Sequence, residues 1–125
     1  MKMRFFKCKH CGKVIAILKE TDVPTICCGE EMIEIHAGTT DAAVEKHVPV
    51  VTTHDNIVEI NVGSVAHPME EKHYIEWIAL QSDQGIHIKT LKPGQEPKAT
   101  FAVVDGNKVN EAYAYCNLHG LWSSK

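Results

Sequence analysis

The sequence predicts an all-β chain in which a small cysteine-rich, metal-binding module precedes an antiparallel β-sandwich. Four of the five cysteines lie within the first 28 residues. Farther along, short apolar runs of alternating polarity are separated by turn dipeptides, a spacing typical of two-sheet sandwiches. Ala-Gly-Thr-Thr interrupts the pattern just after residue 36, so we expect one domain over residues 1–36 and a second over residues 37–125.

Composition and charge exclude several classes of protein. Of the 125 residues, 44% are hydrophobic and 23% are charged, which is a globular balance. The net charge is −3 and neither part is strongly basic, which argues against a nucleic-acid-binding surface. No apolar run is long enough to cross a bilayer, and none follows the basic residues near the N-terminus. We therefore expect no membrane association, no secretory signal and a cytoplasmic location.

The first part is too short to bury a large core, and domains of that size usually depend on a metal, a disulfide or a partner chain. Its cysteines provide the metal option. Cys8-Lys9-His10-Cys11-Gly12 is a C-x-x-C knuckle, and Cys27-Cys28-Gly29 adds two more thiolates. Four thiolates suit a tetrahedral zinc or iron site, and we expect short strands at Val14–Leu18 and Met32–Ile35 around it.

The adjacent pair Cys27 and Cys28 leaves alternatives open. Neighbouring side chains of an extended strand point to opposite faces, so both thiolates reach one ion only if the backbone bends sharply. A disulfide between the two is the strained alternative. On the pattern of cysteines alone, a structural zinc ribbon is the simplest interpretation, with His10 exposed on the knuckle.

The second part contains repeated strand signals separated by Gly-containing turns, such as Pro93-Gly94 and Asp105-Gly106. Asp41–Lys46 is the one segment that reads as helical, and it is short enough to be a single turn. The predicted strands lie at Val58–Val62, Tyr74–Leu80, Ile86–Ile88, Phe101–Val104 and Glu111–Tyr115.

A sparse second set of metal-ligand residue types follows. Cys116-Asn117-Leu118-His119 is a C-x-x-H pair that ends on a glycine, which is moderate evidence for a site. His47, His67 and His73 are weak evidence by themselves, because a lone histidine is more often exposed or hydrogen-bonded. A lone buried cysteine is likewise more often a small apolar residue.

Three longer motifs that contain these residues resemble the desulfoferrodoxins, the two-iron superoxide reductases. They are Glu45–Val50, Gly63–Trp77 and Tyr115–Trp122, in the order in which that family has them. The resemblance includes the four N-terminal cysteines and so spans nearly the whole chain. Lys13–Ile26 departs from the family pattern because it lacks the glycines often found there, which concerns the shape of that loop and not the ligands.

The resemblance implies two iron ions per chain and a homodimer. A desulforedoxin-like module would hold the first iron, and an immunoglobulin-like β-sandwich would hold the second. The first iron would have four thiolate ligands: Cys8, Cys11, Cys27 and Cys28. The second would have four equatorial imidazoles and one axial thiolate, with the sixth position open: His47, His67, His73, His119 and Cys116.

The resemblance also implies an oxidoreductase that reduces superoxide to hydrogen peroxide, a detoxification reaction supplied with electrons by an external rubredoxin-like donor. Charge supports the second site, since a ferrous ion with one thiolate and neutral imidazoles stays cationic, whereas four thiolates make an anionic site. Lys46 would steer the anion and help deliver a proton, and Glu45 would bind the oxidised iron after the product leaves.

Two other functions fit the residues without the resemblance. One is a non-catalytic binding module, in which a zinc knuckle is fused to a sandwich that docks a partner. The other is an electron carrier that uses both irons. The sequence is compatible with a first iron that relays electrons and with one that only stabilises its module.

Overall fold

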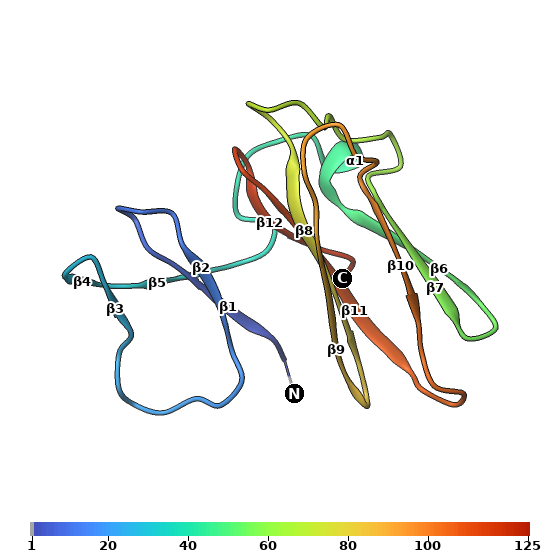
Figure 1. Ribbon diagram of the computed structural model, residues 1–125, viewed down its shortest axis with the longest axis horizontal. Helices are drawn as coiled ribbons and strands as arrows, with labels where there is room; N and C mark the ends of the chain where they lie inside the picture. The colour runs from blue at the N-terminus through green and yellow to red at the C-terminus, as the bar shows by residue number, and fades with distance from the viewer. Residues whose placement is uncertain (1) are drawn as a thin grey trace. The chain divides into compact units, whose positions relative to one another are not determined.

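The computed structural model describes residues 2–125; residue 1, the first residue of the predicted N-terminal domain, lies outside the described residues. The chain forms two compact units, Met1–His36 and Ala37–Lys125. The predicted all-β fold class is confirmed, since strands make up the regular structure apart from a one-turn helix, α1 (Val44–His47) (Figure 1). Within residues 2–125, no helix is long and apolar enough to span a bilayer.

The N-terminal unit consists of a three-stranded antiparallel sheet and a short hairpin. The sheet has the order β2-β1-β5, and β3 pairs with β4 in the hairpin. Phe5 on β1 is buried together with Met3 and Met32, which gives this unit a very small core. The strands are β1 (Arg4–Lys7), β2 (Val14–Ile17), β3 (Ile26–Cys27), β4 (Glu30–Glu31) and β5 (Ile33–Ile35).

The C-terminal unit is an antiparallel sandwich of two sheets, with orders β10-β7-β6 and β12-β11-β8-β9. Every predicted strand of this unit is present, with bounds shifted by a few residues. Two further strands at sheet edges, β6 and β12, were not predicted. The strands are β6 (Pro49–His54), β7 (Ile57–Val62), β8 (Ile75–Ser82), β9 (Gly85–Thr90), β10 (Lys98–Ala102), β11 (Val109–Cys116) and β12 (Gly120–Ser123).

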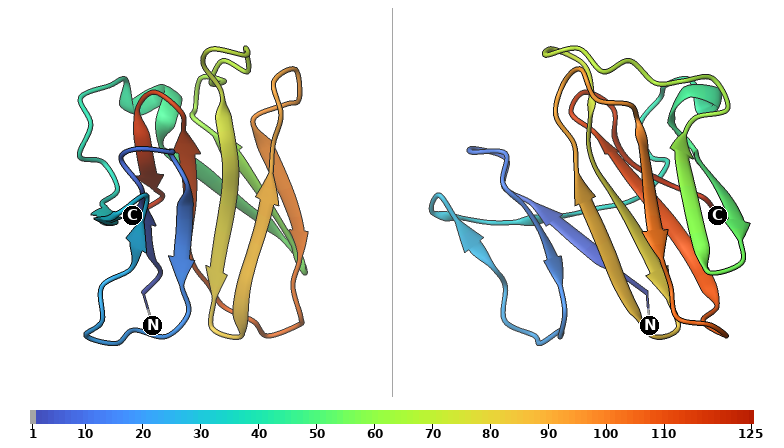
Figure 2. Two further views of the ribbon diagram at one scale, coloured as in Figure 1. Left: turned by 60° about the vertical axis from the view of Figure 1, so that its left-hand side comes forward. Right: turned by 45° about the vertical axis from the view of Figure 1, so that its right-hand side comes forward.

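The sandwich core lies between its two sheets, which Figure 2 shows as separate layers. Alternate residues of β7 point inward, and Val58, Ile60 and Val62 are almost completely buried. They pack with Ile78 and Leu80, whose strand belongs to the opposite sheet, in one apolar cluster. Burying each such side chain stabilises the fold by about 1.5–3 kcal/mol. This cluster therefore holds the two sheets together.

Three irregular segments lie at the same end of the sandwich (Figures 1 and 2). They are the segment with α1, the connection from β7 to β8, and the turn between β11 and β12. The candidate ligands of the second predicted site come from these segments and from Cys116, the last residue of β11. Because the strands beneath them are fixed by the core, residues far apart in the sequence meet at this end.

Candidate metal centres

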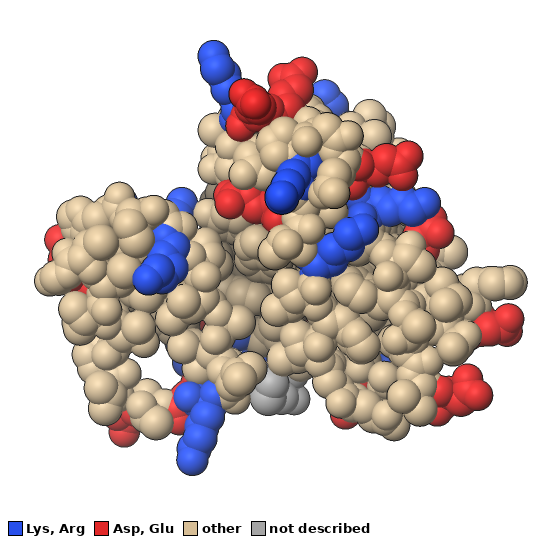
Figure 3. Space-filling model, in the orientation of Figure 1, with Lys and Arg blue, Asp and Glu red and all other residues tan. Residues whose placement is uncertain are grey.

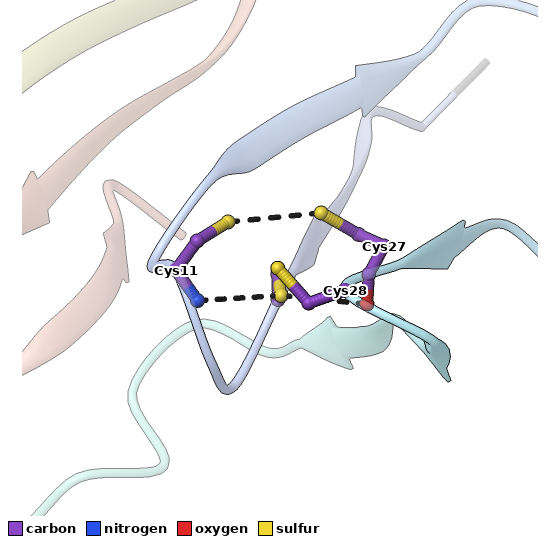
Figure 4. Close-up of side chains that lie close together, drawn as sticks. Cys11, Cys27 and Cys28 are labelled. Carbon is purple, nitrogen blue, oxygen red and sulfur yellow. Dashed lines mark hydrogen bonds between the residues drawn. The ribbon is translucent and has the colours of Figure 1, made fainter.

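The four N-terminal cysteines form one cluster, with their ligand atoms all within 4.8 Å of one another. Cys11 and Cys27 have their sulfur atoms 3.6 Å apart, and the side chains of Cys11, Cys27 and Cys28 point toward a common centre (Figure 4). Thiolates that share one tetrahedral ion at about 2.3 Å have sulfurs about 3.8 Å apart. The cluster therefore has the dimensions of a four-thiolate metal site.

Two tight turns bring these cysteines together. In the knuckle, the N–H of Gly12 donates to the carbonyl of Cys8 at 3.0 Å, and Gly12 has a φ of 80°. The expected sharp bend at the second pair is also present, because Cys28 has a φ of 52°. A left-handed residue between two strands turns the second thiol toward the first. His10 lies outside the cluster and contacts Glu30 at 3.3 Å on the surface.

The close packing of the thiols shifts their pKa values in opposite directions. The backbone N–H of Cys11 lowers the pKa of Cys8 to about 6, so this sulfur is readily a thiolate. Contact with the Cys11 thiol, and then with Cys8, raises the pKa of Cys27 to about 12. Sulfurs this close resist ionising together unless a cation lies between them. The donor set thus fits a thiolate-bound metal.

The second cluster joins His47, His67, His73 and Cys116, whose ligand atoms also lie within 4.8 Å of one another. His119 belongs with them, because its Nδ1 atom is 3.1 Å from Nε2 of His47 and 3.8 Å from the sulfur of Cys116. The five residues that the sequence motifs singled out therefore come together at one end of the sandwich.

Hydrogen bonds to backbone carbonyls orient two of the imidazoles. Nδ1 of His47 donates to the carbonyl of Ala43, and Nδ1 of His67 donates to the carbonyl of Pro68, each at 2.7 Å. A neutral ring with its proton on Nδ1 has a lone pair on Nε2. The two Nε2 atoms lie 3.2 Å apart, so lone pair faces lone pair.

This arrangement fits a metal ion. Imidazole nitrogens bonded at right angles to one ion at about 2.1 Å lie about 3 Å from each other. In addition, Nε2 of His73 is buried without a hydrogen-bond partner within residues 2–125. A cation among these nitrogens satisfies all of their lone pairs.

Burial keeps the imidazoles neutral. It is the main cause that lowers the pKa of His47 and of His73, and it lowers the pKa of His67 to about 4. Repulsion among the rings and the positive charge of Lys46 lower the pKa of His47 and His73 further. Neutral imidazole is the form that binds a metal, so at neutral pH these rings need not lose a proton first.

The thiol of Cys116 is fully buried, and burial raises its pKa. Backbone N–H groups of His119 and Leu118 act in the opposite direction, since their hydrogen bonds stabilise the thiolate and lower the pKa. Trp122 supports two of the neighbouring ligands. The centroid of its ring lies 4.9 Å from the centroid of the His47 ring, and its indole N–H donates to the carbonyl of His119 at 3.0 Å.

Glu45 and Lys46 occupy the exposed turn α1 directly before the ligand His47. In the described part of the chain, the Glu45 carboxylate is not among the clustered ligand atoms. On the face seen in Figure 3, acidic and basic side chains are interspersed at this end of the sandwich. Glu70 and Lys72 contribute to them from the connection between β7 and β8.

Three consecutive residues that contact α1 were not singled out by the sequence motifs as site residues. The carbonyl of Glu45 accepts hydrogen bonds from the N–H of Val65 at 3.0 Å and from the hydroxyl of Ser64 at 3.3 Å. Gly63 passes so close beneath the turn that a Cβ there would lie 2.7 Å from the Glu45 carbonyl oxygen. A glycine directly after a strand signals this kind of close approach, whereas nothing in the sequence marks Ser64.

The antiparallel sandwich and its five clustered ligands define a non-haem metalloprotein of the imidazole–thiolate class. The family model described as desulfoferrodoxin matches residues 39–125. The chain is 49% identical over 122 residues to a desulfoferrodoxin homolog of Archaeoglobus fulgidus, with 98% of this chain and 96% of the relative covered. It is 48% identical over 120 residues to the desulfoferrodoxin of Nitratidesulfovibrio vulgaris, with 96% and 94% covered.

A solved structure agrees with these matches. The superoxide reductase from Treponema pallidum superimposes with a TM-score of 0.85 at 40% identity, and 100% of each chain is covered. The chain belongs to the desulfoferrodoxin family. Its four-cysteine cluster and its cluster of four histidines and one cysteine correspond to the two non-haem iron centres of that family.

Replacing Gly63 tests whether the close approach beneath α1 matters to the iron. Gly63→Ala places a methyl group 2.4 Å from the Val65 carbonyl oxygen, so the turn that ends in His47 must move. We expect iron at the histidine–cysteine centre to bind about 10-fold to 100-fold more weakly, the range for residues that support metal ligands. Competition with a chelator, followed by metal analysis, measures this.

Gly106→Ala is the matched control. Gly106 has a φ of 80°, similar to the 83° of Gly63, but a Cβ there meets nothing within 4 Å. It carries the same left-handed strain without the collision. Equal iron affinity in the two variants would show that the close approach at Gly63 does not position the site.

Proposed function

We propose that this protein is a superoxide reductase that transfers one electron to superoxide at the iron of the histidine–cysteine centre. The observation that carries the proposal is the convergence of four imidazole nitrogens and one buried thiol at a single point. The similar protein from Treponema pallidum is named for this activity. We assign the iron ligands as His47, His67, His73, His119 and Cys116.

The two centres differ in the charge that they present to a small anion. The bound ferrous ion supplies an electron and an open coordination position. Four neutral imidazoles leave its charge unchanged and the Cys116 thiolate removes only one unit, so the centre attracts superoxide. Cys8, Cys11, Cys27 and Cys28 surround the other iron with four negative charges, which repel an anion. The reaction therefore belongs to the C-terminal unit.

Lys46 and Glu45 act before and after the electron transfer in this proposal. The exposed ammonium of Lys46 attracts superoxide toward the centre, and its field already reaches His47 and His73. It also orders water through which a proton passes to the product. The Glu45 carboxylate would serve as a further ligand to the oxidised iron after the product has left.

The reaction balances without releasing dioxygen. Superoxide gains one electron and two protons and leaves as hydrogen peroxide. The electron comes from the ferrous ion, and an external reductant returns it. We propose a rubredoxin-like protein for that reductant, with the reaction taking place in the cytoplasm.

The N-terminal unit has a separate role in this proposal. Residues 1–36 form a desulforedoxin-like iron module and residues 37–125 form the reductase domain. Because the core of the module is so small, its iron stabilises the fold in place of apolar burial. We propose that the protein acts as a homodimer.

Counting products tests the proposed activity. When the iron-loaded, reduced protein meets a pulse of radiolytic superoxide, we expect one hydrogen peroxide per superoxide consumed, with a rate constant near the diffusional ceiling of about 10⁸–10⁹ M⁻¹s⁻¹. A dismutase would give half as much peroxide together with dioxygen. An electron carrier or a zinc-only binding module would give no rapid peroxide formation, and either result would refute the proposal.

Lys46→Ala tests steering. Removing a positive charge beside the centre is expected to slow superoxide capture roughly tenfold at low salt. The dependence of the rate on ionic strength should also weaken, because ions screen an attraction of this kind. Pulse radiolysis at several salt concentrations measures both effects.

Lys108→Ala is the control for net charge. Lys108 is exposed and precedes β11, whose other end carries Cys116, roughly 25 Å away along the strand. It should behave as the unchanged protein does. If both variants react equally fast at low salt, Lys46 has no place in the mechanism.

Glu45→Ala tests the role of the carboxylate after turnover. Capture of superoxide should stay within about a factor of two, because the carboxylate acts only later in the cycle. The optical spectrum of the resting ferric protein should shift, since a ligand is lost. Glu70→Ala removes a nearby charge whose field reaches His73, and it should leave the spectrum in place. An unshifted spectrum in Glu45→Ala would exclude it as a ligand.

A further inference from the structure

His73 comes from the least regular part of the site. It lies in the connection between β7 and β8, where Glu70 and His73 form an isolated bridge and no strand continues. The backbone groups of these two residues exchange hydrogen bonds of 2.9 and 3.0 Å. A ligand on such a loop keeps its place only if something ties the loop to the rest of the site.

The side chain of Asn117 makes that connection on both sides of His73. Its Oδ1 atom accepts a hydrogen bond from the N–H of Tyr74 at 2.9 Å. Its Nδ2 atom donates to the carbonyl of Lys72 at 3.0 Å. The backbone N–H of Asn117 also donates to the carbonyl of Tyr74, at 3.2 Å. One side chain thus holds the residue before the ligand and the residue after it.

The ladder between β8 and β11 explains why this contact is needed. Its register shifts between Tyr115 and Cys116, and its last pair is Cys116 with Ile75. Beyond that pair the two segments share one more backbone bond, from the N–H of Asn117 to the carbonyl of Tyr74. The amide of Asn117 continues the pairing, because it offers a donor and an acceptor together as a peptide group does.

We propose that Asn117 is a positioning residue that sets His73 relative to Cys116 and His119. Asn117 follows Cys116 directly and precedes His119 by two residues, so its position is fixed by the same turn that carries those ligands. Through the two amide hydrogen bonds, three of the five ligands form one rigid group. Asn117 does not touch the iron.

This inference rests on the ligand set of the proposed function, and it concerns how firmly the iron is held. Two variants separate the contributions of the amide. Asn117→Ala removes both side-chain hydrogen bonds and keeps the backbone bond. Asn117→Asp keeps the shape and the acceptor for Tyr74 but turns a carboxylate oxygen toward the carbonyl of Lys72, where two acceptors repel.

The test is the rate at which the iron-loaded full chain loses iron to an excess of chelator. We expect both variants to release iron from the histidine–cysteine centre about 10-fold to 100-fold faster, as for other residues that support metal ligands. The ferric absorption of that centre should shift, because the imidazole of His73 is reoriented. Iron at the four-cysteine centre, measured in the same sample, should leave at the unchanged rate.

Asn107→Ala is the control. Asn107 also uses its side-chain amide, donating to the hydroxyl of Ser82 at 3.0 Å, but near the opposite end of β8 and β11. It should lower the unfolding temperature without changing iron release or the spectrum. If Asn117→Ala does not fold, Asn117→Asp carries the test alone.

Release rates and spectra of the Asn117 variants that match those of Asn107→Ala would overturn the proposal. That result leaves the proposed function intact if the unchanged protein still forms one peroxide per superoxide. The opposite outcome is also distinguishable. If the unchanged protein does not reduce superoxide but the Asn117 variants still release iron fast, the proposed function is refuted and the positioning role of Asn117 stands.

Discussion

Imidazole lone pairs that face one another across about 3 Å repel unless a cation lies between them, and the C-terminal unit is organised around that constraint. His47 has its other nitrogen committed to a backbone carbonyl, and so does His67. Neither ring can turn away without losing that bond. The packed sheets below supply the rigidity that holds the rings in this otherwise unfavourable arrangement. The same neutral donors leave the bound ion cationic, which suits an anionic substrate.

The two metal centres reach their ligand sets by different structural means. Each pair of neighbouring cysteines in the module lies on one local turn, which has a left-handed residue at Gly12 or at Cys28. The histidine–cysteine centre instead needs three chain segments that meet only because seven strands pack as a sandwich. The sandwich buries a large apolar core beneath its site, whereas the module buries only a few apolar side chains beside its cysteines.

Much of this could be predicted from the sequence, and the exceptions have physical reasons. Alternation of polarity predicted the central strand β7. The edge strand β6 begins at Pro49 and exposes the apolar Val50, so polarity does not alternate along it. Motif resemblance singled out the five residues that cluster at the end of the sandwich and the four clustered cysteines. The supporting role of Asn117 could not be predicted, because its partner Lys72 is 45 residues away in the chain. Which residue faces a given carbonyl depends on the packed fold.

The most direct test of the account is anomalous diffraction at the iron absorption edge from crystals of the iron-loaded protein. We expect a peak bounded by Nε2 of His47, His67 and His73, with Nδ1 of His119 and the Cys116 sulfur completing the set. A second peak should lie among the four N-terminal sulfurs. Iron only at the four sulfurs, with nothing among the imidazoles, would contradict the central claim.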